Sequence, residues 1–533
     1  MGKYILILII LLTSVLRFYS LEKVPPSLYW DEASLGYNAY SILKTASDEH
    51  GKFLPITNFA AFGDYKPPGY IYFTVPSIAV FSLNDFAIRF PSAFFGTFTI
   101  LITYFLAKKI FRKEIIALLS AFFLAISPWH LQMSRVAFEA NLALFFSVLG
   151  IYLFVKFAKD DPTYIFLSAL SFLIAIYTFT GQRLFVPLIL IILALQFRKQ
   201  LFANLKFVIP TLLVSAFLFW PLFIFSTKTI EGKLRFNEVT IFNDQKPIQD
   251  SIKDRQLDNF SWWANLVHNR RVYFTLDYLH HYLDAFNPSF LFSKGDANPR
   301  LSIQEIGELY YFDLILILSG LYFLFKKKQQ YRFLIVGWLL ISPLGPATAR
   351  ETPHALRMIH ILPTFQFISA FGLYSLYNLV KFKKIFMAIP TLLLTVTLIY
   401  YLHTYYVHYP PEYSGEWQYG YKQVVSEVQS QYDKVDNIFV TEGLGRPYIY
   451  FLLYNHYDPK KFWADSDVEI DQFYFIHVKS FDKYHFGNVN TQQGQPKRSL
   501  FVVGAGNLPQ GTEKISTVKD LKGTPVFDVG KTN

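Results

Sequence analysis

The sequence predicts a mainly α-helical membrane protein that crosses the bilayer many times. Of its 533 residues, 52% are hydrophobic and only 17% are charged, and the mean hydropathy is +0.27. Aromatic residues make up 19% of the chain, as expected where aromatic belts mark both membrane interfaces. The net charge of +11 then reflects basic loops rather than a nucleic-acid partner. The absence of cysteine excludes disulfides, thiolate nucleophiles and cysteine-ligated metals.

About eleven apolar segments are candidate transmembrane helices, because roughly 20 residues cross the hydrocarbon layer and about 17 to 25 are tolerated. They cover residues 4–20, 89–107, 114–128, 141–157, 163–179, 184–197, 206–225, 310–325, 332–346, 356–380 and 385–404. The first resembles a signal peptide but lacks a small-residue cleavage site, so we expect an uncleaved helix. Residues 67–83 contain Pro67, Pro68 and Pro76. We expect them to form an interfacial or re-entrant segment.

The basic loops set the orientation. With the N-terminus inside, the short lysine- and arginine-rich loops all fall on the inner side, as the positive-inside rule requires. These loops lie within 108–113, 156–159, 198–206, 326–332 and 381–384. Regions 21–88 and 226–309 then lie outside, together with the C-terminal tail. We therefore predict a multi-pass plasma-membrane protein with a transmembrane domain at 1–404 and an external domain at 405–533.

The tail is less apolar than the rest of the chain and is predicted to form a small α/β domain. Tyr421 to Gln431 has the spacing of an amphipathic helix, and Asn437–Thr441 and Ser499–Val503 have the pattern of strands. No internal repeat is evident.

The first candidate site is Trp30-Asp31-Glu32-Ala33, two adjacent carboxylates directly after the first apolar segment. Ionisable groups near hydrocarbon are expensive and read as functional. The residues that follow have helical spacing typical of an interfacial helix, so the pair is expected at its N-cap and first turn, where the helix dipole favours the ionised form. Such a carboxylate accepts a proton or binds a cation. The alternative is that Asp31 only caps the helix.

The second candidate is Asp64-Tyr65-Lys66-Pro67-Pro68, where a polar loop meets an apolar run. An ammonium at Lys66 would suit a lipid phosphate at headgroup depth, with Tyr65 beside it. The alternative is a lysine that merely extends its ammonium from the membrane to water.

The third candidate runs from Ser127-Pro-Trp-His to Arg135 and Glu139. Arg135 and Glu139 are four residues apart, so one alternative is an ordinary ion pair along a helix. The other is that Glu139 is a second acidic group facing Asp31.

Further cations fall on the same predicted side of the membrane. Most lie near helix ends, where each alone suits a membrane anchor, but the guanidinium groups of the arginines together suit bidentate phosphate recognition. They are Arg183, Arg300, Arg350, His354 and Arg357. There is no phosphate-binding Walker loop and no His-x-x-x-His zinc helix. An external site also lacks nucleoside triphosphates, which favours a lipid-carried donor.

Together, Trp30-Asp31-Glu32, Tyr65-Lys66-Pro67-Pro68, Arg89-Phe-Pro-Ser-Ala93 and Ser127-Pro-Trp-His through Glu139 resemble the bacterial GT-C membrane glycosyltransferases. The nearest groups are the family 39 enzymes that are protein O-mannosyltransferase-like and aminoarabinose transferase-like. The resemblance covers roughly residues 1–400.

The resemblance implies a GT-C enzyme that uses a polyprenyl-phosphate sugar donor on the external face of the plasma membrane. By position, Asp31 would be the base for the acceptor hydroxyl, Glu32 would orient or support it, and Lys66 would contact the donor phosphate. Glu139 matches a second acidic site that is often Asp in the family. The chemistry needs a base near the acceptor and cations near the departing phosphate.

We expect no required cofactor, although a Mg²⁺ or Mn²⁺ ion bridging the carboxylates and the phosphate stays open. The expected partners are the lipid-phosphate donor, a lipid, glycan or protein acceptor, and membrane lipids. The alternatives are another polyprenyl-linked transferase, such as an oligosaccharyltransferase or a glycan ligase, and a lipid or polysaccharide transporter. Transporters tend to show related halves and mid-membrane charges. Here the charges gather at one face.

Overall fold

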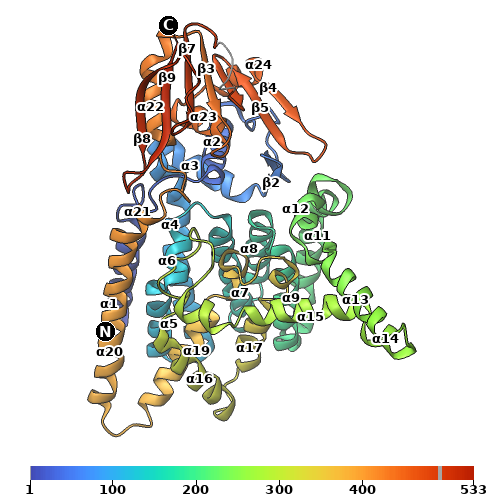
Figure 1. The fold of residues 1–533 in the computed structure, drawn as a ribbon. Coiled ribbons are helices and arrows are strands. Elements are labelled where there is room, and N and C mark those ends of the chain that lie inside the picture. Colours follow the sequence, from blue (N-terminus) through green and yellow to red (C-terminus); the bar gives the residue numbers. More distant parts are fainter. Residues whose placement is uncertain (1, 490–494, 533) are drawn as a thin grey trace. The chain divides into compact units, whose positions relative to one another are not determined.

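A computed structural model describes residues 2–489 and 495–532 (Figure 1). The chain divides into two compact units. The first unit comprises Met1–Leu16, Phe95–Met133 and Ala140–Tyr401, and the second comprises Arg17–Phe94, Ser134–Glu139 and Leu402–Asn533. The second unit therefore joins the predicted C-terminal domain to the first predicted external region, whereas the sequence analysis divides the chain at residue 404.

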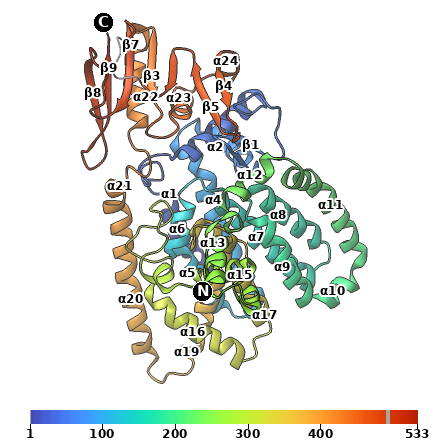
Figure 2. The ribbon, with the colours of Figure 1, turned by 45° about the vertical axis from the view of Figure 1, so that its right-hand side comes forward.

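All of the predicted apolar segments are helical, and 63% of the protein is helix, which confirms the mainly α class. These helices are α1 (Gly2–Phe18), α4 (Asp85–Phe111), α5 (Glu114–Ile126), α7 (Glu139–Lys159), α8 (Tyr164–Thr178), α9 (Gln182–Gln196), α11 (Leu205–Lys228), α16 (Tyr311–Lys326), α17 (Arg332–Ile341), α19 (Thr364–Tyr377) and α20 (Lys383–His403). Short helices α6 (Pro128–Ser134), α10 (Arg198–Ala203) and α18 (Ala355–Met358) lie between them. In the first unit α8 packs against α9 and α11 (Figure 2).

Within the described residues 2–489 and 495–532, four stretches are long and apolar enough to cross a membrane on their own. They are Asp85–Phe111, Glu139–Lys159, Leu205–Lys228 and Lys383–Glu412. Two bent pairs raise the number to six if each is one span, namely Glu114–Ile126 with Pro128–Ser134 and Ala355–Ile361 with Thr364–Tyr377. The predicted count of about eleven spans stays a prediction, because several of the helices are shorter than a bilayer is thick.

Two glycines bring α16 and α19 into close contact in the first unit. A Cβ atom on Gly320 would lie 2.1 Å from the Ile368 carbonyl oxygen, and one on Gly372 would lie 2.2 Å from the Leu316 carbonyl oxygen. Small residues of this kind let the backbones of membrane helices approach each other closely. Any side chain at either position would therefore force the two helices apart.

The predicted external region 226–309 is a chain of short helices rather than an open loop. It contains α12 (Glu231–Val239), the 3₁₀ turn η1 (Ile241–Asn243), α13 (Lys246–Leu257), α14 (Trp262–Val267), α15 (Arg270–Asp284) and the π-helical turn η2 (Ser289–Ser293). Asn269 caps α15, since its side chain accepts a hydrogen bond from the Arg271 N–H.

The second unit begins with α2 (Trp30–Thr45), which packs against α3 (Gly69–Phe81). Between them, β1 (Phe59–Ala61) and β2 (Asp64–Lys66) form an antiparallel pair that aligns Phe59 with Lys66. Helix α3 forms most of the segment 67–83 that was predicted to be interfacial or re-entrant. Its 13 residues are too few for a span, so its membrane position stays a prediction.

The C-terminal part of this unit is an α/β sheet domain, as predicted, with a sheet larger than the sequence suggested. The strand order is β4-β5-β6-β3-β7-β9-β8, and β3 is parallel to both neighbours. The strands are β3 (Asn437–Thr441), β4 (Asp467–Ile470), β5 (Ile476–Phe481), β6 (Tyr484–Gly487), β7 (Ser499–Gly504), β8 (Glu513–Lys519) and β9 (Pro525–Lys531). The helices are α21 (Tyr409–Glu412), α22 (Tyr421–Gln431), α23 (Pro447–Tyr454) and α24 (Pro459–Asp465).

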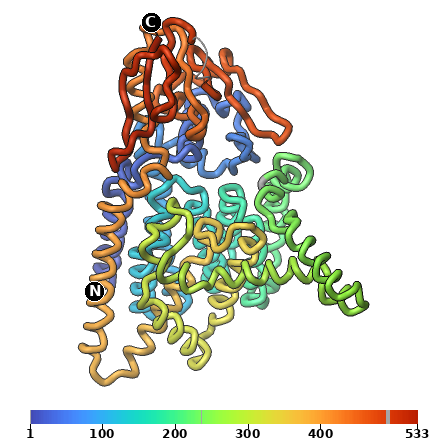
Figure 3. The backbone as a smooth tube through the Cα atoms, viewed as in Figure 1, coloured from blue at the N-terminus to red at the C-terminus, as the bar shows by residue number. Residues whose placement is uncertain are grey.

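Glu49 links α2 to this domain through its side chain and its backbone carbonyl. The Glu49 side chain is fully buried and accepts a 3.1 Å hydrogen bond from Asn38 Nδ2 on α2, and the Trp463 indole N–H of α24 donates to the Glu49 carbonyl at 3.0 Å. Burial raises the pKa of Glu49 to about 8. Helix α2 packs against α23 and α24 of the same unit, and Figure 3 shows the blue and orange-red segments side by side there.

Candidate functional site

The candidate site is built on the first turn of α2. Tyr29 is the N-cap, and its backbone N–H donates to Glu32 Oε2 at 3.1 Å, as in a capping box. Asp31 and Glu32 both lie in the first turn, which confirms that part of the prediction. The expectation that a carboxylate is the N-cap residue is wrong, because Tyr29 is the N-cap and the helix begins at Trp30, one residue before Asp31.

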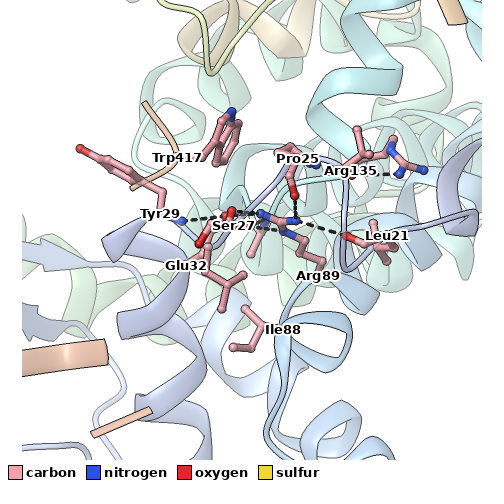
Figure 4. Close-up of polar contacts among 12 residues, drawn as sticks. Leu21, Pro25, Ser27, Tyr29, Glu32, Ile88, Arg89, Arg135 and Trp417 are labelled. Atoms are coloured by element: carbon pink, nitrogen blue, oxygen red, sulfur yellow. Dashed lines mark hydrogen bonds and ion pairs between the residues drawn. The ribbon is translucent and has the colours of Figure 1, made fainter. Parts of the chain in front are cut away.

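Glu32 is held by a buried arginine of α4 (Figure 4). Arg89 Nε donates to Glu32 Oε1 and Arg89 Nη2 donates to Glu32 Oε2, each at 2.9 Å. The Ala137 backbone N–H adds a 2.9 Å bond to Glu32 Oε1. Glu32 and Arg89 are at most 1% exposed, so this bidentate pair lies out of contact with solvent.

Arg89 uses its remaining donors on the chain that precedes α2. Its guanidinium donates to the carbonyl oxygens of Leu21, Pro25 and Ser27. Arg89 thus fixes the loop before α2, and Glu32 fixes α2 to residue 137. Glu32 already accepts four hydrogen bonds, so it is a positioning residue for its neighbour Asp31 rather than a group aimed at a substrate.

Asp31 and Lys66 form an ion pair in which Asp31 is the more exposed partner. Lys66 Nζ lies 3.2 Å from Asp31 Oδ1 and 2.7 Å from Asp64 Oδ2. The Asp31 side chain is 37% exposed, whereas that of Lys66 is only 12% exposed. The structure therefore brings the first and second predicted groups together, and it leaves Asp31 accessible to a ligand.

Three carboxylates influence the charge of Lys66. Burial alone would lower its pKa, but the nearby charges of Asp31, Asp64 and Glu139 raise the pKa well above the usual range. Lys66 is therefore a permanent ammonium ion at neutral pH. The third predicted acidic group, Glu139, therefore lies within electrostatic reach of Lys66, and the hypothesis that it faces Asp31 stays a prediction.

Arg135 has a structural role in this arrangement. Helix α6 ends at Ser134 and α7 begins at Glu139, so the predicted helical pair of Arg135 with Glu139 is wrong. The Arg135 guanidinium donates instead to the carbonyl oxygens of residues 17, 19, 20 and 24 and to the Tyr405 hydroxyl. These hydrogen bonds favour a role in holding residues 17–24 and Tyr405 together over the predicted contact with substrate.

The strand pairing explains Asp64 and Tyr65. Successive side chains of a strand point to opposite faces, so Asp64 and Lys66 share one face of β2. Tyr65 lies on the other face, and its predicted contact with substrate stays a prediction. The sequence analysis quoted Asp64 without giving it a role, although its i, i+2 spacing from Lys66 was a usable signal.

The remaining predicted cations lie in the first unit and have their own partners. Arg183 Nη1 donates to Ser226 Oγ at 3.1 Å, and Arg350 Nε lies 2.7 Å from Asp244 Oδ1. Arg300 Nε donates to Asn298 Oδ1 at 3.3 Å. Their convergence on one phosphate stays a prediction.

His354 and Arg357 belong to one local motif at the start of α18. The His354 side chain caps this helix by accepting from the Arg357 backbone N–H. The Arg357 guanidinium lies 3.6 Å from Glu351 Oε2. Nearby, the buried Asp296 carboxylate accepts from the Ala355 N–H at 2.6 Å.

Comparison with known proteins gives this geometry a family context. Residues 7–178 match the family model described as dolichyl-phosphate-mannose-protein mannosyltransferase, a range that contains Asp31, Lys66, Arg89 and Glu139. An uncharacterized protein of Aquifex aeolicus is 29% identical over 172 residues. That match covers 32% of this chain and 32% of the relative, so the chain matches about a third of the relative's length.

Two solved structures share the fold. ArnT from Cupriavidus metallidurans bound to undecaprenyl phosphate matches with a TM-score of 0.54 at 11% identity, over 98% of this chain and 97% of that one. The archaeal oligosaccharyltransferase AglB from Archaeoglobus fulgidus, in complex with an inhibitory peptide and a dolichol-phosphate, matches with a TM-score of 0.51 at 13% identity. That match covers 85% of this chain and 63% of AglB.

This chain has the GT-C fold of membrane glycosyltransferases. In this GT-C chain, no group of three or more histidine, aspartate or glutamate side chains within residues 2–489 and 495–532 is arranged to hold a metal ion. The centre of the acidic cluster is occupied instead by the Lys66 ammonium.

Proposed function

We propose that this GT-C chain transfers a sugar from a polyprenyl-phosphate donor to an acceptor hydroxyl on the external face of the plasma membrane. The observation that carries the proposal is the contact of Asp31 with Lys66, which places a half-exposed carboxylate 3.2 Å from a buried ammonium. A base and a phosphate-binding cation are the two groups that this reaction needs side by side.

The chemistry follows from that pair. The Asp31 carboxylate accepts the proton of the acceptor hydroxyl, whose oxygen forms the new bond to the anomeric carbon of the sugar. The bond from that carbon to the phosphate oxygen breaks, and the electron pair leaves with the polyprenyl phosphate. Lys66 stabilises the departing negative charge, because its ammonium is charged throughout the physiological pH range.

The acidic neighbours of Lys66 have a further role in this scheme. Asp64 stays bound to the ammonium at 2.7 Å and holds it in place when Asp31 turns to the acceptor. The Glu32–Arg89 pair keeps the first turn of α2 fixed during this exchange. Glu139 adds a third carboxylate beside the ammonium.

The donor class is supported by two neighbours, since ArnT binds undecaprenyl phosphate and AglB binds dolichol-phosphate in their solved structures. AglB also supports the second candidate function, oligosaccharyl transfer. The sugar transferase is favoured because the match to ArnT extends over nearly the whole of both chains, whereas 63% of AglB is covered. A transporter is disfavoured because the paired charges lie at a helix start and on a short strand rather than within a broken spanning helix.

The test compares two isosteric variants that both remove a partner of Lys66. Asp31→Asn is expected to lower transfer by about 10²- to 10⁴-fold, the usual contribution of a general base. Asp64→Asn is the matched control and is expected to lose much less. The readout is mass spectrometry of envelope glycans and glycoproteins from cells that lack the chain and are complemented with each variant. Equal losses in the two variants, or retained transfer with Asp31→Asn, would exclude the base assignment.

A further inference from the structure

A helical arm of the first unit, formed by residues 246–284 in α13, α14 and α15, has an outer surface that the proposed reaction does not use. In Figure 1 α14 lies at the far end of this arm, away from the other helices of its unit. At this end Trp262 is 81% exposed and Leu266 is 70% exposed, and Phe260 beside them is also exposed. Large apolar side chains gathered on one surface indicate a binding partner.

The apolar surface continues along α15. Leu276, Leu279 and Leu283 are all exposed, and their i, i+3, i+7 spacing places them on one stripe of the helix. The opposite side of α15 is occupied by contacts within the protein. The helix therefore has one face that is packed, and a second apolar face that has no covering within its own unit.

The polar side chains of the arm are used to join its helices. His268 Nε2 lies 2.9 Å from Asp258 Oδ2, and His268 Nδ1 lies 2.8 Å from the Tyr273 hydroxyl. The Tyr273 hydroxyl in turn donates to Asp254, and Ser251 Oγ donates to the His268 carbonyl at 2.6 Å. This network fixes α13 against α15. The exposed apolar face is therefore part of an arm whose helices are joined by hydrogen bonds.

The base of the arm lies at the end of an apolar helix. Tyr278 and Tyr282 donate their hydroxyls to the carbonyl oxygens of Leu344 and Leu340, at 3.0 and 2.9 Å. These carbonyls belong to the last turn of α17 and the turn that follows it, shortly before Arg350 and Glu351, the first charged residues after the apolar stretch that starts at Arg332. The arm therefore starts at the level where membrane helices meet water.

We propose that the arm lies in the membrane–water interface, with Trp262, Leu266 and the leucine stripe of α15 inserted among the lipid headgroups and upper acyl chains. Tryptophan favours this depth because its ring is apolar and its N–H is polar. Arg270 and Arg271, exposed where α15 begins beside the tip, face the lipid phosphates. The partner is the bilayer surface itself, and the inference does not depend on the proposed transferase activity.

The adjoining helix supports a lipid partner over a protein one. Helix α11 ends 18 residues before the arm begins, and only 17% of its apolar window is buried within the protein. Only the short elements α12 and η1 separate this lipid-facing helix from the arm in sequence. An interfacial arm extends that lipid contact sideways, in the manner of an amphipathic helix lying in the plane of the membrane.

The absence of cysteine from the chain makes a direct test feasible. Single-cysteine variants Leu266→Cys and Leu279→Cys place an environment-sensitive fluorophore on the apolar face. Asp277→Cys is the matched control, because Asp277 is exposed on the same helix but lies about 100° around the helix axis from Leu276, off the leucine stripe. Each full-length variant is reconstituted in phosphatidylcholine nanodiscs with or without brominated acyl chains. Elution as a single species shows that each variant is folded.

We expect brominated lipid to reduce the fluorescence at positions 266 and 279 several-fold more than at 277, and iodide in the water to give the reverse order. Quenching of all three probes by iodide alone would overturn the proposal, because the arm would then extend into water. Protection of positions 266 and 279 from both quenchers would also overturn it, since it would place the face against protein. Trp262→Cys provides a second probe at the tip with the same expected result.

Discussion

The buried pair of Glu32 and Arg89 predicts a strong energetic coupling. In Glu32→Gln, an amide replaces the carboxylate, and its NH₂ group faces the N–H donors that Glu32 now binds. In Arg89→Met, the carboxylate loses its two 2.9 Å bonds, and the carbonyl oxygens of the preceding loop lose their donors. Each single change therefore leaves buried polar groups without partners.

The size of the effect follows from burial. Breaking a buried ion pair by removing one partner typically costs about 3–5 kcal/mol, whereas replacing both partners is far less damaging. The double variant Glu32→Gln/Arg89→Met is therefore expected to lose less than the sum of the singles, by roughly 0.5–3 kcal/mol. The control is Lys109→Gln, which breaks an ion pair with Asp160 of 2.7 Å that is about one-third exposed. We expect that change to cost at most about 1 kcal/mol.

The assay is thermal unfolding of the purified protein in detergent at one pH and one salt concentration. For domains of about 150–250 residues, 1 kcal/mol shifts the midpoint by roughly 2–4 °C, so the two single variants are expected to unfold well below the wild type. Transfer activity is measured in parallel at a temperature where all variants are folded. If the losses of the two single variants simply add in the double variant, the reasoning about the buried pair is refuted.

Three further outcomes are expected. Lys66→Ala should raise the apparent KM for the lipid-phosphate donor by about ten- to a hundredfold, the size of a hydrogen bond to a charged group, with Lys66→Arg retaining part of the affinity; an unchanged KM in steady-state kinetics would contradict the phosphate role. The folded protein keeps the Glu49 proton up to about pH 8 while the unfolded chain releases it near its ordinary value of 4.5. Stability should therefore fall between those pH values by up to about 1.4 kcal/mol per unit, and Glu49→Gln should remove this component of the pH dependence of the unfolding midpoint. Transfer should persist after treatment with EDTA; loss of activity that Mg²⁺ or Mn²⁺ restores would show that a metal is required.

Much of the helical framework was predictable, because apolar runs and basic loops report directly on membrane segments. Helix α2 and strands β3 and β7 also followed from local spacing. The span count was less predictable, since short helices such as α17, with ten residues, satisfy an apolar pattern without the length of a bilayer. Hydropathy identifies an apolar helix, whereas its length decides whether the helix can cross the bilayer.

The candidate site was predictable in its members and not in their roles. Asp31, Lys66 and Glu139 were recognisable as charges near hydrocarbon, and the structure brings them together. Arg89 was quoted only as part of a motif, because its partners lie in distant segments and no local pattern reveals them. For Arg135 the local pattern was present but wrong. Its i+4 spacing from Glu139 suggested one helix, whereas α6 ends at Ser134 and α7 begins at Glu139.

The hydrogen bonds around Glu32 and Arg89 also set an order of assembly. A ribosome releases Asp31 and Lys66 long before it releases Ala137, whose N–H completes the bonds of Glu32. The first external region therefore cannot adopt its final geometry until Arg89 of α4 has been synthesised. The last hydrogen bond forms only after Ala137, in the turn before α7, has followed. A chain arrested before residue 137 would contain Asp31 and Lys66, the base and the cation of the proposed reaction, and would still lack the Ala137 N–H that completes the bonds of Glu32.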